Sequence, residues 1–247
     1  MKCSRHEVRR PLRILGSFLV GAGLLLLVWA LIVWRWQDPF TAFYTKAQQH
    51  ALASSYEERL AAYAPLPAPK TGKPAFDLAA QQRLVALQAR RYRHSLRVGD
   101  ALGRLRVPRL GLNSVIVTGT DHDSLTKGPG WYTGSFLPGE GRLIYIAGHR
   151  TTYLAPFAEI DSLRPGDRVT IDVPYGTFLY QIRGHAIVPA DDVSRLRSHG
   201  LEVLALQACH PRFFATQRYI AYAKPVAVTP RGGRPYAPGS GTITARG

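Results

Sequence analysis

One uncharged stretch near the N-terminus constrains this chain more than any other feature of its sequence. Residues 14–34, ILGSFLVGAGLLLLVWALIVW, are 21 residues without an acidic or basic side chain. As a helix rising about 1.5 Å per residue, they span the roughly 30 Å hydrocarbon core of a bilayer. A cleaved secretory signal is the alternative, but its apolar run is usually about 7–15 residues, and no small-x-small cleavage motif follows here. We therefore expect an uncleaved transmembrane signal anchor over residues 14–34.

The charges beside this segment predict its orientation. Five basic residues precede it against one acidic residue, whereas Arg35 and then Asp38 follow it. Basic flanks stay on the cytoplasmic side of a membrane. We expect residues 1–13 in the cytoplasm, a single pass through the cell membrane, and the rest of the chain outside.

The net charge of +16 raises the question of nucleic-acid binding, which the distribution of charge answers. Residues 98–229 carry 14 basic and 11 acidic side chains, so this part of the chain is nearly balanced. Most of the excess lies in the membrane flank, in residues 37–97 and in the tail, where it suits an anionic lipid surface or cell wall. We expect no nucleic-acid partner.

Residues 35–97 have the composition of an extracytoplasmic stalk and helical linker. Residues 37–63 favour a helix, and four prolines in 64–75 break it and favour a stiff, extended linker. A second helix is expected from Phe76 onward, with Asp77 as its N-cap. Its apolar side would consist of Leu78, Leu84, Leu87 and Tyr92, and would pack on the following domain or on a partner.

From Ala101 onward, the sequence consists of short β-rich runs separated by Gly and Pro. Seven or eight strands at this spacing, with a short helix at 155–163 and no long crossover helices, predict a closed or sandwiched antiparallel sheet. We place this folded domain at residues 98–229. The tail, 230–247, is rich in Gly and Pro, carries three basic residues and no acidic one, and is expected to be disordered.

The two cysteines, Cys3 and Cys209, fall on opposite sides of the predicted membrane segment and cannot pair within one chain. A lone exported thiol needs burial or a use. Thiol catalysis requires a thiolate, a proton carrier and a group that stabilises an oxyanion. His149 and Cys209 each end an apolar strand, and Arg218 opens the next one. These residues alone leave two interpretations, an exported thiol enzyme or a buried structural cysteine.

Metal and cofactor chemistry find little support in the sequence. His210 adjoins Cys209, but no second cysteine follows the membrane segment and no paired-ligand spacing occurs. No dedicated acidic loop suggests calcium binding. We expect no metal and no cofactor.

Several long motifs resemble those of one enzyme family. LRVPRLGL, GTDHDSLTKGPGWYTGSFLPGEG, IAGHRTTYLAPFAEIDSLRPGD, VPYGTF and ACHPRFFATQR occur in the order and spacing of the sortases, most closely the class E sortases of high-GC Gram-positive bacteria. The resemblance covers roughly residues 104–225. It implies an all-β, eight-stranded sortase-type barrel with short helices, here preceded by one transmembrane helix and a helical, proline-rich stalk.

The resemblance also implies a reaction and a set of partners. A sortase is a cysteine transpeptidase that cleaves a C-terminal sorting signal of Leu-Ala-x-Thr-Gly or Leu-Pro-x-Thr-Gly type between Thr and Gly. It transfers the acyl group to an amine of the cell wall or of a pilin. Carried onto this sequence, the nucleophile is Cys209, the proton carrier is His149, and Arg218 holds the oxyanion and substrate backbone. Another exported thiol peptidase, or a non-catalytic barrel that binds wall proteins, are the alternatives.

Two further positions are candidates for substrate binding. Tyr132 in GPGWYTG matches a tyrosine of class E sortases, whose hydroxyl would contact the amide that alanine, unlike proline, leaves in the sorting signal; packing under the loop is the alternative role. Ala208 stands where sortases commonly have Thr before the nucleophile. The missing hydroxyl predicts an altered substrate preference with activity retained.

Overall fold

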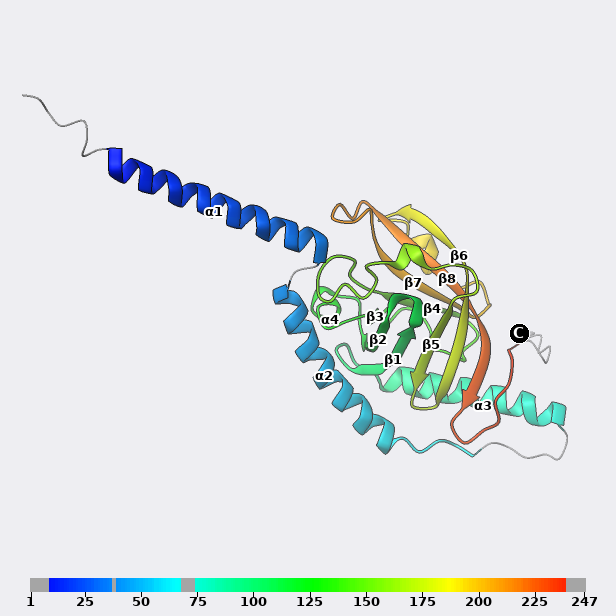
Figure 1. Ribbon diagram of the computed structural model, residues 1–247. Helices are drawn as coiled ribbons and strands as arrows, with labels where there is room; N and C mark the ends of the chain where they lie inside the picture. Colours follow the sequence, from blue (N-terminus) through cyan, green and yellow to red (C-terminus); the bar gives the residue numbers. More distant parts are fainter. Residues whose placement is uncertain (1–8, 37–38, 68–73, 239–247) are drawn as a thin grey trace, which may run out of the picture. The chain divides into compact units, whose positions relative to one another are not determined.

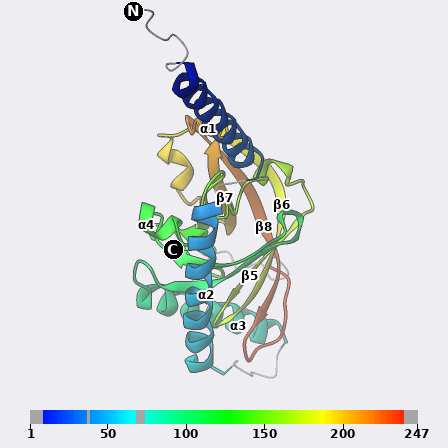
Figure 2. The same ribbon diagram turned by 60° about the vertical axis from the view of Figure 1, so that its left-hand side comes forward.

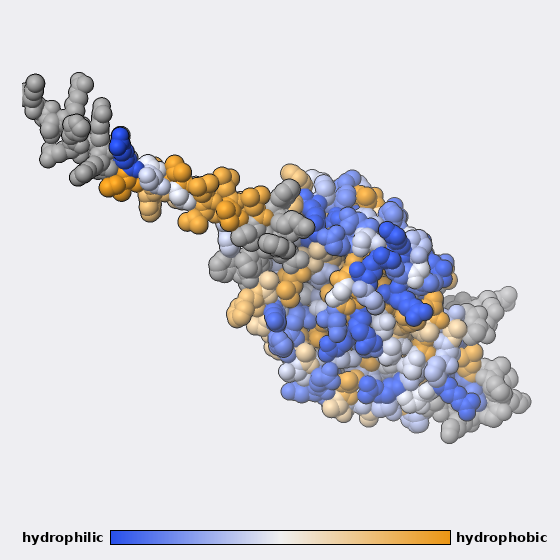
Figure 3. Space-filling model, in the orientation of Figure 1, coloured by the Kyte–Doolittle hydropathy of each residue, from blue (hydrophilic) through white to orange (hydrophobic). Residues whose placement is uncertain are grey.

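The computed structural model describes residues 9–36, 39–67 and 74–238. The chain divides into two compact units, Met1–Pro39 and Phe40–Gly247. The first contains one long helix, α1 (Arg9–Trp36), and its segment Arg13–Leu31 is long and apolar enough to cross a membrane. Figure 3 shows this helix as a nearly continuous apolar surface, which is compatible with the predicted single-pass anchor.

The second unit is built on a closed barrel of eight strands (Figure 1). The strands are β1 (Ala101–Val107), β2 (Leu112–Thr118), β3 (Gly130–Trp131), β4 (Leu143–Ala147), β5 (Arg168–Val173), β6 (Gly176–Pro189), β7 (Val203–His210) and β8 (Gln217–Pro230). They follow one another around the barrel in the order β1-β2-β3-β4-β7-β8-β6-β5. The predicted eight-stranded barrel is therefore confirmed. Only two of its neighbouring pairs, β2·β3 and β4·β7, are parallel.

Helices occupy the connections and the flanks of the barrel. They are α2 (Pro39–Ala62), α3 (Pro74–Ser95), the single-turn α4 (His122–Leu125), and the 3-10 turns η1 (Pro108–Leu110), η2 (Ile160–Ser162) and η3 (Val193–Leu196). The helix predicted at 155–163 is wrong except for η2. Ala155 has a φ of 37°, outside the right-handed helical range, so the chain turns there before η2 begins.

Alternation along β7 separates an inner face from an outer face. Leu204, Leu206 and Ala208 point into the main core. Val203 and Ala205 belong instead to a second apolar cluster on the outside of the barrel, which also contains side chains of β4, β6 and β8. We call this cluster the outer strip; it consists of Tyr132, Leu143, Tyr145, Ala186, Val188, Leu196, Val203, Ala205, Ile220 and Tyr222. The period-two geometry of a strand thus gives β7 two apolar faces.

The expected stalk is wrong as a description of α2, because this helix packs on the barrel. Leu52 and Tyr56 lie against Ala101, Val115 and Val117 in a shared apolar cluster. The amide of Gln49 completes the contact: its Oε1 accepts from Val115 N at 2.7 Å, and its Nε2 donates to Val115 O at 3.0 Å. α2 therefore covers backbone groups of β2 that β3, only two residues long, does not reach.

α3 packs on the barrel as predicted, but its buried face shares only Tyr92 with the predicted apolar side. Val85, Ala89 and Tyr92 are buried in the main core, whereas the predicted Leu84 and Leu87 are only half-buried. Two glutamines share the buried face; Gln88 Oε1 accepts hydrogen bonds from Tyr63 Oη and Leu66 N. Because glutamine is polar, a search for hydrophobic periodicity does not identify these residues as buried. The helix begins at Pro74, so Asp77 lies in its first turn and not at the N-cap.

The segments predicted as linker and tail are only partly described. Of the proline-rich stretch, residues 63–67 have no regular structure, and residues 68–73 lie outside the described residues. The predicted disorder from residue 230 is wrong for 230–238: Tyr236 pairs with Val228, and Gln81 Nε2 donates to Arg234 O at 2.6 Å. Residues 239–247 lie outside the described part.

These contacts extend the folded unit well beyond the predicted boundary at residue 98. Removing residues 40–97 would expose Ala101, Val115 and Val117 and leave Gln49's backbone partners on β2 without their bonds. We expect residues 98–247 to unfold more than about 10 °C below residues 40–247 in a thermal melt followed by circular dichroism. Equal midpoints would contradict the assignment of α2 and α3 to the folded unit.

Candidate functional site

Three neighbouring strands end at the same place on the outer face of the barrel. β4 and β7 run parallel with Ala147 opposite Gln207, and Gly148 N continues the ladder by donating to Gln207 O at 3.0 Å. Two residues beyond this opposed pair stand His149, just past the end of β4, and Cys209, on β7. β7 and β8 run antiparallel with Cys209 directly opposite Arg218. Directly opposed residues have Cβ atoms about 5 Å apart. Register alone therefore brings the three predicted residues together.

These side chains line one pocket of about 320 Å³, which we call the Cys209 pocket. Tyr132, His149, Cys209 and Arg218 all face it. Tyr145, Val188, Leu196 and Ile220 of the outer strip form its apolar wall. The pocket thus joins a thiol, an imidazole and a guanidinium to an apolar surface. Figure 2 shows the segment with η3, coloured yellow, beside the upper part of β7.

His149 is held with one ring nitrogen unused. Its Nε2 is buried and has no hydrogen-bond partner among the described residues. Buried polar atoms without a hydrogen-bond partner are rare in proteins and need an explanation. One explanation is that the atom forms a hydrogen bond with a bound substrate. Burial, and then repulsion from His122, lowers the pKa of His149 below 6.5. The neutral imidazole is therefore favoured at neutral pH.

Strained backbone follows His149 and shapes its surroundings. Tyr153, Leu154 and Ala155 all have positive φ, of 54°, 60° and 37°. The Tyr153 ring lies 5.1 Å from the His149 ring, and Tyr153 N donates to Thr41 Oγ1 of α2 at 3.1 Å. Consecutive positive φ values in side-chain-bearing residues cost energy and persist only where neighbours hold them. α2 therefore helps to fix the loop that places the imidazole.

Gly148 allows that loop to pass close to the barrel. A Cβ at Gly148 would lie 2.7 Å from the ring of Phe157, which is fully buried. Phe157 N also donates to His149 O at 3.2 Å. A larger residue at 148 would have to displace either this ring or the backbone that carries His149.

Arg218 is fixed to the turn between β7 and β8. Its Nη1 donates to Ala215 O at 2.8 Å and to Gln217 O at 3.0 Å. Within the described part of the chain, these two bonds both use Nη1. The planar guanidinium thereby presents Nε and Nη2 as donors for a ligand in the pocket.

Tyr132 lies in the pocket wall, in edge contact with Tyr145 at a ring distance of 6.3 Å. Burial, and then the nearby Tyr222, raises the pKa of Tyr145 to about 12, so this hydroxyl stays protonated. Gly134 fits against the Tyr132 ring, where a Cβ would come within 2.7 Å of ring carbons. The glycine that ends GPGWYTG therefore lets the loop close over this side chain.

The structure does not bring Ala208 to the pocket. Its side chain is fully buried on the inner face of β7, opposite Tyr219, while its neighbours Gln207 and Cys209 face outward. A threonine hydroxyl at this position would point into the core and away from a ligand bound at Cys209. The candidate role of residue 208 in substrate contact is thus not supported by its placement.

Arg150 is a site residue that the sequence analysis did not identify. Its side chain is only 4% exposed, and its Nη1 donates to His210 Nδ1 at 2.9 Å and to Cys209 O at 3.5 Å. Its Nη2 binds Asp161 at 2.5 Å. Arg150 therefore joins the loop after β4 to the end of β7, beneath His149 and Cys209. Its position directly after His149 was the only signal available in the sequence.

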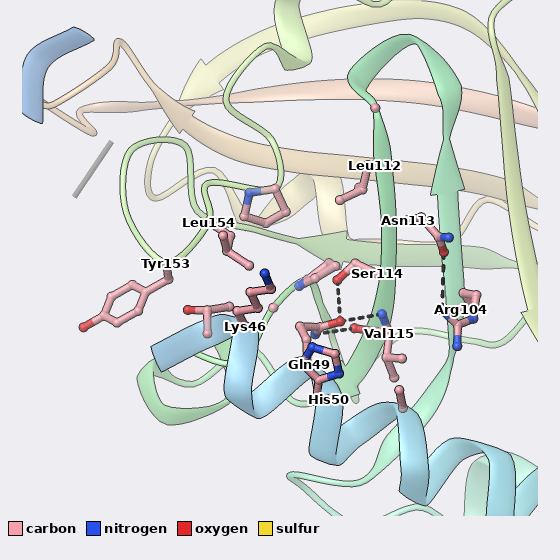
Figure 4. Close-up of a pocket in the computed structure, with 16 residues that line it drawn as sticks. Lys46, Gln49, His50, Arg104, Leu112, Asn113, Ser114, Val115, Tyr153 and Leu154 are labelled. Carbon is pink, nitrogen blue, oxygen red and sulfur yellow. Dashed lines mark hydrogen bonds between the residues drawn. The ribbon is translucent and has the colours of Figure 1, made fainter. Parts of the chain in front are cut away.

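A second pocket, of about 430 Å³, lies between α2 and β2 (Figure 4). Gln49 forms its base through the bonds to Ser114 and Val115, and Tyr153 and Leu154 form one side. None of Cys209, His149 and Arg218 lines it. Tyr153 lines this pocket and also touches His149, which lines the Cys209 pocket.

Candidate metal ligands do not gather in the described residues: no three side chains of His, Cys, Asp or Glu form a cluster there. His210, considered as a ligand beside Cys209, accepts a hydrogen bond from Arg150 instead.

Comparisons with known proteins show what this chain is similar to. Residues 105–226 match the family model of the sortase domain. Sortase D of Bacillus subtilis is 39% identical over 132 residues, which make up 52% of this chain and 65% of that protein. The chain thus matches slightly less than two thirds of the length of this relative.

Solved structures show the same barrel. A Clostridium perfringens Sortase D5 transpeptidase has a TM-score of 0.57 at 21% identity, covering 73% of this chain and 99% of that one. The SrtA sortase from Actinomyces oris has a TM-score of 0.52 at 29% identity, covering 57% of this chain and 88% of that one. The barrel has the sortase fold. Because relatives from different sortase classes match, the similarity does not select the predicted class E.

The environment of His149 predicts that its pKa will change when His122 is substituted. Substituting His122→Asn removes the neighbouring imidazole, so the pKa of His149 should rise, while remaining below about 6.5 because burial is the larger cause. An NMR titration of the His149 ring in both proteins measures this. His50→Asn, an exposed substitution on α2, serves as the control and should leave the value unchanged. An unchanged pKa in His122→Asn would show that repulsion from His122 is absent.

The hydrogen bonds of Arg150 predict that its substitution will affect both the stability of the fold and the reactivity of the Cys209 thiol. Arg150→Met should lower the free energy of unfolding by about 3 kcal/mol and alter the rate at which iodoacetamide alkylates Cys209. Arg212→Met is a matched control, because Arg212 also donates to Ala158 O but is exposed and pairs with Glu159 at the surface. Arg212→Met should lower the free energy of unfolding by less than about 1 kcal/mol. An equal loss of unfolding free energy in the two variants would contradict the structural role assigned to Arg150.

Proposed function

We propose that this chain, whose residues 105–226 match the sortase domain, is a membrane-anchored cysteine transpeptidase. It would cleave a C-terminal sorting signal of Leu-Ala-x-Thr-Gly or Leu-Pro-x-Thr-Gly type between Thr and Gly. The acyl group passes to an amine of the cell wall or of a pilin. The observation that carries the proposal is the convergence of Cys209, His149 and Arg218 on one pocket, with Nε2 of His149 buried and unpaired.

The first half of the reaction uses the thiol and the imidazole. The thiolate of Cys209 attacks the threonine carbonyl carbon, and the electron pair of the C=O bond moves to the oxygen. When the C–N bond breaks, the imidazolium of His149 donates a proton to the departing glycine amine. The lowered pKa of His149 suits this step, because a more acidic imidazolium releases its proton more readily.

The second half reverses these roles. The acceptor amine attacks the thioester carbonyl, neutral His149 takes the proton that the amine loses, and the Cys209 thiolate departs. The same side chain thus returns to its imidazolium form at the end of the cycle.

Arg218 and Tyr132 would act on the substrate rather than on the nucleophile. Nε and Nη2 of Arg218 are free of the bonds that hold Nη1, and can donate to the oxyanion or to substrate carbonyls. Tyr132 stands in the pocket wall, where its hydroxyl would meet the substrate residues before threonine. This contact favours the alanine-containing signal that the resemblance to class E implies, and the peptide preference decides the class.

The proposed setting follows from α1. With this helix as a single-pass span, residues 1–13 would lie in the cytoplasm and the barrel at the outer face of the membrane. The clients would be secreted proteins that carry sorting signals and reach the membrane from the same side.

A peptide assay tests the proposal. Residues 40–247 are incubated with Leu-Ala-x-Thr-Gly and Leu-Pro-x-Thr-Gly peptides and triglycine as the amine. We expect cleavage after Thr and transfer to triglycine, loss of both in Cys209→Ala, and a kcat/KM lower by about 100-fold or more in Arg218→Lys. Arg212→Lys, in the same turn, is the control and should retain activity. Cleavage that persists in Cys209→Ala would falsify the proposal, and thiol alkylation without peptide cleavage would identify a non-catalytic barrel.

A further inference from the structure

A basic groove lies on the same face of the barrel as the Cys209 pocket, further along β4, β7 and β8. It has a volume of about 510 Å³ and an apolar floor of Leu143, Val203 and Tyr222. Basic side chains surround this floor; they are Arg183, Arg195, Arg197, His199 and Lys224. No acidic residue lines the groove.

The positive charge of the groove is largely uncompensated. Arg195 pairs with Asp192 at 3.4 Å. Arg183, Arg197 and Lys224 are exposed and form no ion pair with any residue in the described ranges. Clustered charges of one sign around a concave apolar surface attract a ligand of opposite sign. The ligand that fits is therefore anionic, with apolar parts that can lie on the floor.

The groove and the Cys209 pocket share one apolar surface. Leu143, Val203 and Tyr222 of the groove belong to the outer strip, together with Tyr145, Leu196 and Ile220 of the Cys209 pocket. An extended ligand can therefore pass from one to the other without leaving the apolar surface. The η3 segment contributes to both, through Leu196 in the pocket and Ser194 and Arg195 in the groove.

The direction of a bound sorting signal follows from the chemistry of its residues. Its threonine carbonyl must reach Cys209, and its leucine and alanine or proline come before this threonine. The apolar wall of Tyr145, Leu196 and Ile220 is where these apolar residues fit. The chain that precedes the leucine then continues toward the basic groove.

Strand geometry gives the number of residues involved. Val203 and Cys209 are six positions apart on β7, or about 20 Å at roughly 3.3 Å per residue. An extended peptide covers this distance with about six residues. The leucine lies three residue steps before the threonine, which is half of this distance. Residues two and three positions before the leucine therefore reach the groove.

We propose that the basic groove binds acidic side chains located two and three positions before the leucine of the sorting signal. This inference rests on the proposed transpeptidase function and adds a substrate preference to it. Arg183, Arg197 and Lys224 would bind the carboxylates, and the floor would take the methylene groups of glutamate. The client proteins would then be those with an acidic segment directly before the signal.

Matched peptides test this preference. Glu-Glu-Gly-Leu-Ala-x-Thr-Gly is compared with the same peptide carrying Gln-Gln or Lys-Lys in place of Glu-Glu, using residues 40–247 and the full chain in detergent. At low ionic strength, kcat/KM should be about ten-fold higher for the Glu-Glu peptide than for the Gln-Gln peptide, and the difference should shrink at high salt. The double variant R197E/K224E should reverse the order, so that the Lys-Lys peptide is preferred.

The control changes the charge by the same amount elsewhere. R90E/R168E replaces two exposed basic residues on α3 and β5, outside the groove, and should keep the ratio of the Glu-Glu to the Gln-Gln peptide. Thermal melts check that both variants fold, and the salt dependence of the unsubstituted protein tests the inference without any variant. Equal kcat/KM for the three peptides, or equal loss of preference in both double variants, would overturn the inference. Failure to cleave any peptide would instead overturn the proposed function.

Discussion

The parallel pairing of β4 with β7 is the constraint on which the rest of the site depends. Parallel strands cannot be joined by a tight turn, so the chain leaves β4, forms β5 and β6, and returns before β7 begins. The two excursions, after β4 and after β6, carry His149 and η3. The antiparallel pairing of β7 with β8 then sets Arg218 opposite Cys209. Residues 69 positions apart in the chain thus meet because of backbone hydrogen bonds, and no direct bond among the three side chains is needed.

Helix α2 adds to this arrangement from outside the barrel. Through Gln49 it satisfies backbone groups of β2, and through Thr41 it accepts a hydrogen bond from Tyr153. Tyr153 in turn lies against His149. The helix that follows the apolar segment in the sequence is therefore in contact with the loop that holds His149. Support for the site comes from residues that an account restricted to the sortase domain match, 105–226, would omit.

Sequence reasoning from local patterns predicted a closed or sandwiched sheet and placed His149, Cys209 and Arg218 at strand ends, whereas the eight-stranded barrel was implied by the family resemblance. Alternating apolar residues mark strands, and a strand end marks where a side chain emerges. It did not predict β3, which is two residues long, nor the buried face of α3, where Gln81 and Gln88 bond to backbone groups distant in sequence. It also named Ala208 as a substrate-binding candidate, although this side chain points into the core. Alternation counted from Cys209 would have shown that the neighbouring position points inward, and Arg150 acquires its role only through contacts made in three dimensions.

The two faces of β7 have a consequence for how this protein can change. Leu204, Leu206 and Ala208 pack in the main core, whereas Val203 lines the basic groove and Gln207 and Cys209 line the Cys209 pocket. A substitution at an outward position can alter recognition without disturbing the core, and one at an inward position can alter packing without touching a ligand. Within a single strand of eight residues, selection for stability and selection for specificity can therefore act on alternate positions, so that descendants of this chain can change what they bind while keeping the same barrel.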